Sequence, residues 1–135
     1  MSITKLTKAL TGYKKVYTKD GRSVVLTLEI PRGASIHRVD SPKHPDFCSS
    51  GNRDKLRASS AKVISAQIYF WDGVTHTYKP EEEKTRKRIF RSIHHEKFLY
   101  KIGEIARPTK PFCHKDLVCA SGIHFFLTKY DAIHY

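Results

Sequence analysis

Acidic residues are scarce in this sequence. Asp and Glu together number 13 against 25 for Lys and Arg, so the formal net charge is +12. This shortage excludes an acidic buffer protein or a solvating acidic tail, and it favours an anionic or acidic partner.

Long hydrophobic runs are missing as well. The two longest stretches without a charged residue run from Val63 to Trp71 and from Leu117 to Thr128. Both are shorter than the roughly 18 apolar residues that a membrane-spanning helix needs. The sequence therefore predicts no membrane span and a soluble or peripheral protein.

Cysteine is rare, with Cys48, Cys113 and Cys119 as its three positions. An odd number at low density is not a disulfide framework, and the first residues hold no apolar stretch long enough for a signal peptide. We therefore expect a reducing, intracellular compartment. With 135 residues, of which 39% are hydrophobic, the chain is expected to form a single domain over residues 1–135 with one modest core.

Two Asp-Gly pairs separate runs of strand-forming residues. Asp20-Gly21 lies between 13–19 and 22–30, and Asp72-Gly73 lies between 61–71 and 74–78. Asp and Gly tolerate the positive φ angles of a type I′ turn, so each pair predicts a tight β-hairpin. Alternation places Val24, Leu26, Leu28 and Ile30 on one face of their strand. Over 61–71 it places Val63 and Ile68 on opposite faces of the strand.

The C-terminal segment combines a buried strand with a helix start. Residues 122–127 form an apolar run, which predicts a central strand with Ile123, Phe125 and Leu127 on one face and His124 and Phe126 on the other. Thr128 and Asp131 have the spacing of a helix N-cap, and Ala132 is small enough to let the helix lie close to the sheet.

Two further segments have helical features. Ile3, Leu6 and Leu10 share one face if the N-terminus is helical, and 81–91 has three acids followed by five bases, which suits either a short helix or a solvated connection. The expected fold class is α+β, mainly antiparallel β with a short C-terminal helix and room for a short N-terminal helix.

Basic residues concentrate in two clusters that are candidates for binding an anionic partner. The candidate residues are Arg53, Lys55, Arg57, Lys84, Arg86, Lys87, Arg88 and Arg91. Phosphate contacts at such clusters would weaken with salt, whereas the alternative is a solvated face. Phe90, Phe98 and Tyr100 do not interleave with these bases as a stacking platform requires, and rings at such spacing are expected in the core. Acidic protein is therefore favoured over nucleic acid as the partner.

Four potential zinc ligands lie close together in the sequence: Cys113, His114, Cys119 and His124. Their spacing matches no known ribbon or finger, which favours packed thiols and a hydrogen-bonded histidine over structural zinc. We expect no bound metal and no cofactor. No nucleophile and base have a recognised catalytic spacing, so the protein is not expected to be an enzyme.

The last third of the chain resembles the C-terminal signature of an uncharacterised domain family of large double-stranded DNA viruses, phages and some bacteria, which often follows pentapeptide repeats. The matching positions are Tyr100, Lys101, Gly103, Cys119, Gly122, Ile123, His124, Phe125, Phe126, Thr128, Ala132 and Tyr135. Upstream, 28–31, 53–58 and 61–63 resemble segments of the same family. This chain departs from the family in lacking a repeat array, in carrying an extra loop and in its excess positive charge.

The resemblance implies a shared fold and a viral setting, and it implies nothing catalytic. Combined with the composition, it predicts a non-enzymatic structural or adaptor protein of a large DNA virus, such as a minor capsid component that bridges other virion proteins or acidic proteins. The expected location is the virion or the host cytoplasm. The alternative is a basic module that binds nucleic acid without strong sequence specificity.

Overall fold

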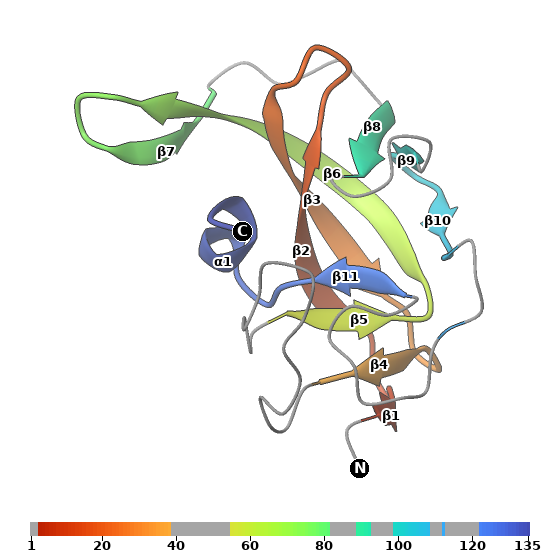
Figure 1. Ribbon diagram of the computed structural model, residues 1–135. Coiled ribbons are helices and arrows are strands. Elements are labelled where there is room, and N and C mark those ends of the chain that lie inside the picture. Colours follow the sequence, from red (N-terminus) through yellow and green to blue (C-terminus); the bar gives the residue numbers. More distant parts are fainter. Residues whose placement is uncertain (1–2, 39–54, 82–88, 93–98, 109–111, 113–121) are drawn as a thin grey trace.

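The computed structural model describes residues 3–38, 55–81, 89–92, 99–108, 112 and 122–135. In these residues the fold is mainly antiparallel β, with one short helix near the C-terminus (Figure 1). The expected α+β class with a dominant β component is confirmed. The loop expected over residues 40–52 lies outside the described residues.

The larger sheet has seven strands in the order β10-β6-β3-β2-β8-β9, and β7 pairs with β6 beside this path. Its strands are β2 (Leu10–Tyr17), β3 (Ser23–Ile30), β6 (Ala61–Asp72), β7 (Thr77–Pro80), β8 (Ile89–Ser92), β9 (Leu99–Lys101) and β10 (Ile105–Ala106). The strand β8 occupies the end of the segment expected to be a helix or a solvated connection, and residues 82–88 of that segment are outside the described part.

The smaller sheet has four strands in the order β1-β4-β5-β11. They are β1 (Ile3–Lys5), β4 (Ser35–His37), β5 (Leu56–Ala58) and β11 (Ile123–Phe125). A single bridge between Tyr13 and Phe126 joins the chain after β11 to β2. The smaller sheet thus crosses the lower ends of the long strands in Figure 1.

The main hydrophobic core contains residues of both sheets. Val24, Leu26, Leu28 and Ile30 of β3 are all fully buried in it, as their alternation predicts. Val25 on the opposite face of β3 is buried too, because it packs in a second cluster with Phe126, Ala132 and Ile133 under the helix. The sheet is therefore covered on both faces where the C-terminal segment docks.

The first Asp-Gly pair closes the β2–β3 hairpin, but with a different turn from the one expected. Gly21 N–H donates to Thr18 O at 3.0 Å, and Thr18 N–H donates to Arg22 O at 3.0 Å. Gly21 has φ +87°, whereas Asp20 does not have a positive φ. A three-residue loop that ends in a left-handed glycine fits this pattern, and the type I′ prediction is wrong.

The second pair also opens a hairpin, between β6 and β7, and again not as a type I′ turn. The return strand begins at Thr77, which pairs with Asp72, and not at Val74 as expected. The left-handed residue is His76, with φ +53°, and not Gly73. The loop has the four residues 73–76, and the residue with positive φ is the last of them, directly before β7.

Strict alternation over 61–71 is broken by a bulge. Thr27 of β3 pairs with Ser65 of β6, whereas the next residue, Leu28, pairs with Val63, so Ile64 is an extra residue in the ladder. The bulge turns Val63 onto the same core face as Ile68, where both are buried, and it leaves Ile64 exposed. The expectation that Val63 and Ile68 lie on opposite faces is wrong for this reason.

The N-terminal helix is not formed. Ile3–Lys5 is β1, which pairs with β4 through Ile3 and His37, and Leu10 begins β2. The apolar spacing that suits a helix also suits two short strands separated by a turn. Pairing with β4, far away in the sequence, decides between them.

The C-terminal segment has the predicted cap and helix. Thr128 Oγ1 accepts from Asp131 N–H at 3.1 Å, and α1 (Lys129–Ile133) buries Ala132 against β2 and β3. The prediction for β11 is only partly right, because β11 ends the order of the smaller sheet and is not central. Ile123 and Phe125 are buried, but Leu127 is 40% exposed because the strand stops before it.

Candidate interaction surface

Five aromatic and imidazole rings form a continuous row between the β6–β7 hairpin and α1. This aromatic row consists of Trp71, His76, Tyr78, Tyr130 and His134. Trp71 and Tyr78 lie opposite each other on β6 and β7, with ring centroids 5.1 Å apart. Tyr78 contacts His134 edge-on at 5.7 Å, and His134 stacks on Tyr130 at 4.1 Å. His76 in the hairpin loop lies 6.5 Å from Trp71.

Much of the row faces solvent. Trp71 is 54% exposed and Tyr130 is 70% exposed, and Val74 at the hairpin tip is exposed as well. Figure 1 shows the hairpin projecting from the larger sheet on the side where α1 lies. Exposed apolar groups that are contiguous, rather than scattered singly, mark interaction sites.

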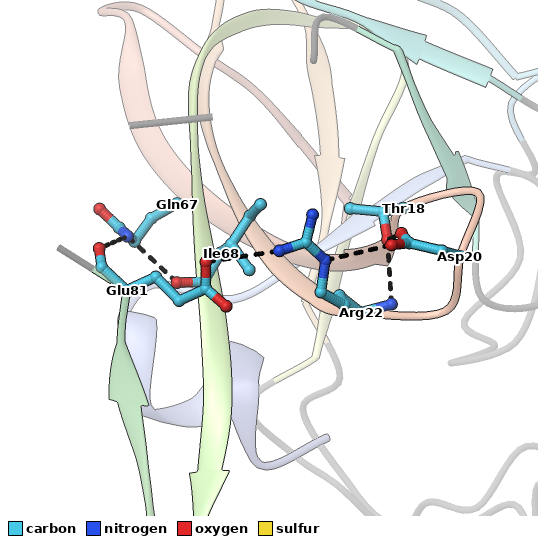
Figure 2. Close-up of polar contacts among 6 residues, drawn as sticks. All are labelled: Thr18, Asp20, Arg22, Gln67, Ile68 and Glu81. Carbon is cyan, nitrogen blue, oxygen red and sulfur yellow. Dashed lines mark hydrogen bonds and ion pairs between the residues drawn. The ribbon is translucent and has the colours of Figure 1, made fainter. Parts of the chain in front are cut away.

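Hydrogen bonds fix the base of the hairpin, as Figure 2 shows. Glu81 N–H, just after β7, donates to Ile68 O at 2.9 Å, and the Gln67 side chain donates to Glu81 O at 2.8 Å. The Glu81 carboxylate accepts from Arg22 Nη1 at 3.4 Å, and Arg22 also pairs with Asp20 at 3.4 Å. The β2–β3 loop therefore holds the point where β7 leaves β6.

An ion pair stabilises the other face of the hairpin. Lys79 Nζ lies 2.8 Å from Asp72 Oδ2, and Val74 N–H donates to Asp72 Oδ1 at 2.9 Å. The hydrogen bond from Lys79, together with that from the Val74 N–H, holds the pKa of the Asp72 carboxyl at about 2. Asp72 therefore stays ionised at neutral pH and keeps the loop closed.

The structure describes three of the eight basic residues predicted to bind an anionic partner: Lys55, Arg57 and Arg91. Arg53, Lys84, Arg86, Lys87 and Arg88 lie outside the described residues. Arg91 is half-buried in β8, whereas Lys55 and Arg57 are buried, at 2% and 0% exposure. This burial contradicts the solvent-facing surface expected for Lys55 and Arg57.

Aromatic neighbours accommodate these two buried cations. Lys55 Nζ donates to the Tyr135 hydroxyl at 2.6 Å and lies 4.6 Å from the centre of the Tyr135 ring. The Arg57 guanidinium lies 5.0 Å from the centre of the Phe112 ring. Arg57 is on β5, where it pairs with His37 of β4 on one side and with His124 of β11 on the other. Ring faces attract cations that are withdrawn from water, so both residues help to hold the fold together.

The rings near the predicted basic clusters belong to the core. Phe90 and Tyr100 are buried, and burial raises the pKa of the Tyr100 hydroxyl; Phe98 is outside the described residues. The interpretation of Phe90 and Tyr100 as core residues is therefore confirmed.

Of the four potential zinc ligands, the structure describes His124 alone. It lies half-buried in β11, and its carbonyl oxygen accepts from Lys14 Nζ at 2.9 Å. Cys113, His114 and Cys119 fall in the undescribed range 113–121. Within the described ranges there is no group of three His, Cys, Asp or Glu side chains that could hold a metal.

The sequence interpretation missed the aromatic row, although signals for it exist. Trp71 and Tyr78 flank the second Asp-Gly turn, so a hairpin there makes them cross-strand neighbours. Tyr130 and His134 are four residues apart, which places them on one side of the terminal helix. No local pattern shows that the two pairs meet.

Comparison with known proteins gives one finding. The model of DUF5758, a family of unknown function, matches residues 2–132. No curated protein and no solved structure matches the chain. Among the described residues, no helix has the length and apolar character to cross a membrane.

Proposed function

The chain belongs to DUF5758, a family of unknown function, and we propose that it is a non-enzymatic adaptor that binds partner proteins through the aromatic row. The observation that carries this proposal is the exposure of Trp71 and Tyr130 within a row of contacting rings. The expected membership of an uncharacterised family is confirmed. The viral setting, including a role as a minor capsid component, rests on the sequence resemblance and stays a prediction.

The composition of the row suits a protein interface. Trp and Tyr dominate binding energies at interfaces, because each buries a large area while only two side-chain torsions are fixed. Val74, exposed at 88%, extends the apolar area at the hairpin tip. A partner that covers these groups removes from water a surface that the chain itself leaves uncovered.

The mounting of the hairpin supports the same function. Contacts of Glu81 with Ile68, Gln67 and Arg22 fix the hairpin at its base, and Asp72 closes its loop. A surface held in its binding geometry loses less conformational entropy when the partner arrives. The β6–β7 hairpin is therefore preorganised for binding a partner.

The charge of the chain indicates the chemistry of the partner. A net charge of +12 attracts an acidic protein over long range and accelerates its encounter. Close to the row, the buried Lys15 amine lies 5.1 Å from the centre of the Tyr78 ring, and Lys129 is an exposed base on α1. An acidic partner with an apolar centre matches this surface.

Binding of single-stranded nucleic acid is the second candidate, and the presence of exposed rings beside lysines favours it. The ring geometry favours protein instead. Trp71 and Tyr78 meet at 72°, and Tyr78 and His134 at 89°, so ring edges cover ring faces along the middle of the row. Stacked bases need open faces, whereas a protein side chain packs against edges and faces alike.

Trp71 provides the test, because it is the single tryptophan of the chain. Peptides selected on the full chain from a displayed random library should be acidic with apolar centres. Their binding should shift the Trp71 emission to shorter wavelength as water leaves the indole. Tyr130→Ala should weaken that binding at least tenfold, which corresponds to about 1.4 kcal/mol.

Ile105→Ala is the matched control, because Ile105 is 51% exposed on β10 and lies outside the row. It should leave peptide affinity unchanged. Equal affinity of wild type and Tyr130→Ala would contradict the proposal. If no peptide is selected and oligothymidine quenches Trp71 with an affinity that falls steeply with salt, the nucleic-acid candidate replaces it.

A further inference from the structure

The outer edge of β1 is an open end of the smaller sheet. Because β1 comes first in the order β1-β4-β5-β11, it has a strand partner on one side only among the described residues. Figure 1 shows β1 at the lower end of the molecule, away from the β6–β7 hairpin. The open edge therefore lies apart from the aromatic row.

The register of the sheet shows which backbone groups of β1 point to the open edge. Ser35 of β4 lies opposite Lys5, and its N–H and C=O are both directed toward β5: the N–H donates to Ser59 Oγ and the C=O accepts from Ser59 N–H, each at 2.9 Å. Facing residues of an antiparallel pair turn their backbone groups either toward each other or both away, so Lys5 directs its N–H and C=O outward. Ile3, two residues earlier, does the same, whereas Thr4 between them faces β4.

A fixed turn stands at the end of this edge. Gly33 N–H donates to Leu6 O and Leu6 N–H donates to Ala34 O, both at 2.9 Å, so two residues oppose Leu6. With φ +89°, Gly33 is the left-handed first residue of a β-bulge. Ala34 N–H also donates to Pro31 O at 3.1 Å, which closes a turn with Arg32 at its second position. Arg32 is therefore presented from a backbone that hydrogen bonds hold in place.

This turn and the end of β1 enclose an open basic groove. Its volume is about 480 Å³, within the range of about 300–1,000 Å³ that is usual for binding sites. The groove is lined by Lys5, Leu6, Thr7, Arg32 and Gly33. Lys5 and Arg32 are exposed and Thr7 adds a hydroxyl donor, whereas none of these lining residues is acidic. The groove therefore attracts an anionic group to the end of the open edge.

We propose that β1 binds an extended acidic segment of a partner protein as a fifth strand of the smaller sheet. The outward N–H and C=O groups of Ile3 and Lys5 supply the backbone hydrogen bonds of this added strand. Side chains alternate along a strand, so every second residue of the segment lies on the side of Lys5, and these are the positions for Asp or Glu. A further carboxylate enters the groove beside Arg32. This inference does not rest on the adaptor function of the aromatic row.

Other occupants of the edge match it less well. Pairing of β1 with β1 of a second copy would bring together two chains that each carry a net charge of +12, and like charges oppose it. Lysine on an edge strand discourages pairing with neutral strands as well, whereas it attracts an acidic one. Phosphate groups of a nucleic acid accept hydrogen bonds but donate none, so they would leave the outward C=O groups of Ile3 and Lys5 without partners.

Hydrogen exchange in the wild-type chain tests the added strand directly. The probe is a short synthetic peptide of alternating Glu and Val, and the amide exchange rates of the full chain are measured by NMR with and without it. The amides of Ile3 and Lys5 should exchange much more slowly when the peptide is bound. The amide of Thr4, which already faces β4, should change little and is the internal control. A peptide with Lys in place of Glu should not bind.

Exposed side chains provide matched variants. Lys5→Gln and Arg32→Gln should each weaken peptide binding about threefold, because single exposed ion pairs contribute little. Lys19→Gln removes an exposed lysine from the β2–β3 loop, at the opposite end of the long strands, and should leave the affinity unchanged. The Trp71 emission should not respond to this peptide.

Several outcomes would overturn the proposal. These are no binding of the Glu-Val peptide, binding without slower exchange at Ile3 and Lys5, and equal affinity for the Lys-containing peptide. Binding that Tyr130→Ala abolishes and Arg32→Gln leaves intact would place the peptide on the aromatic row. Slow exchange that appears without peptide and increases with chain concentration would show that a second copy occupies the edge. If oligothymidine slows the exchange and the peptide does not, the edge binds nucleic acid instead.

Discussion

Replacing Gly12 with alanine tests the packing between β2 and the end of β11. A Cβ atom placed on Gly12 would lie 2.5 Å from Cδ2 of Phe125 and 3.2 Å from Cε2 of the same ring. Real Cβ contacts essentially never fall below 3.0 Å, so something must move. Phe125 is fully buried in the main core and has little room to retreat.

The sign of the effect follows from two opposing terms. Alanine is favoured over glycine inside a strand by about 0.5–1 kcal/mol, so Gly12→Ala would stabilise the fold if there were space. Overpacking a filled core costs about 1–3 kcal/mol. We therefore expect Gly12→Ala to lower the free energy of unfolding by about 1–2 kcal/mol. Gly73→Ala, with nothing within 4 Å of the new Cβ, should have little effect.

A double-mutant cycle isolates the contact. In the background of Phe125→Ala, which removes the Cγ, Cδ2 and Cε2 atoms that the new Cβ meets, Gly12→Ala should become neutral or stabilising. The coupling free energy should therefore be about 1 kcal/mol or more. For comparison, Phe125→Ala should cost about 3–5 kcal/mol through the cavity it leaves, and Thr128→Ala about 1 kcal/mol through the lost helix cap.

Urea denaturation followed by circular dichroism gives all the required free energies. If Gly12→Ala is as stable as wild type, or if the cycle is additive, Phe125 does not fill the space above Gly12 and the description of the core is wrong. Equal midpoints for Phe125→Ala and Thr128→Ala would lead to the same conclusion.

Three further outcomes are expected. Gly21→Val should destabilise the fold by about 1–3 kcal/mol because φ at Gly21 is +87°, whereas Gly73→Val, at a position without positive φ, should cost much less; equal melting temperatures would contradict this. NMR titration should place the pKa of Asp72 near 2, and Lys79→Met should raise that pKa. The ordinary pKa of an Asp side chain is 3.8, so the stability due to this ion pair is present above about pH 4 and is lost as the pH falls through about 2. Burial lowers the pKa of the Lys14 amine to about 7, so the unfolded chain binds more protons between about pH 7 and 10.5; stability should therefore rise with pH there, and Lys14→Met should show a smaller rise in denaturation midpoint.

Local sequence rules predicted the parts of the fold that local physics controls. Alternation placed Leu26 and Leu28 in the core because β3 is regular along its length. The cap at Thr128 was predictable because its partner, Asp131, lies three residues away. The Asp-Gly pairs located both hairpins, but not their turn types, because the loop length depends on where the ladder of strand pairs ends.

The errors arose where distant segments decide. The apolar positions at the N-terminus fit a helix, but β4 supplies a strand partner that no local window contains. The bulge at Ile64, which lies in the pairing of β6 with β3, places Val63 and Ile68 on the same face of β6. Lys55 and Arg57 were assigned to a surface because charged residues are mostly exposed, whereas Tyr135 and Phe112, far along the chain, provide ring faces that accommodate them.

The aromatic row depends on the docking of the C-terminal segment. Tyr130 and His134 contribute to the row, and the buried Ala132 holds both residues against the sheet. A change that undocks this helix must therefore abolish peptide binding. Single substitution of an exposed ring should instead remove peptide binding and leave the helix docked. Only variants that lose binding while the helix stays docked can therefore assign a function to the row.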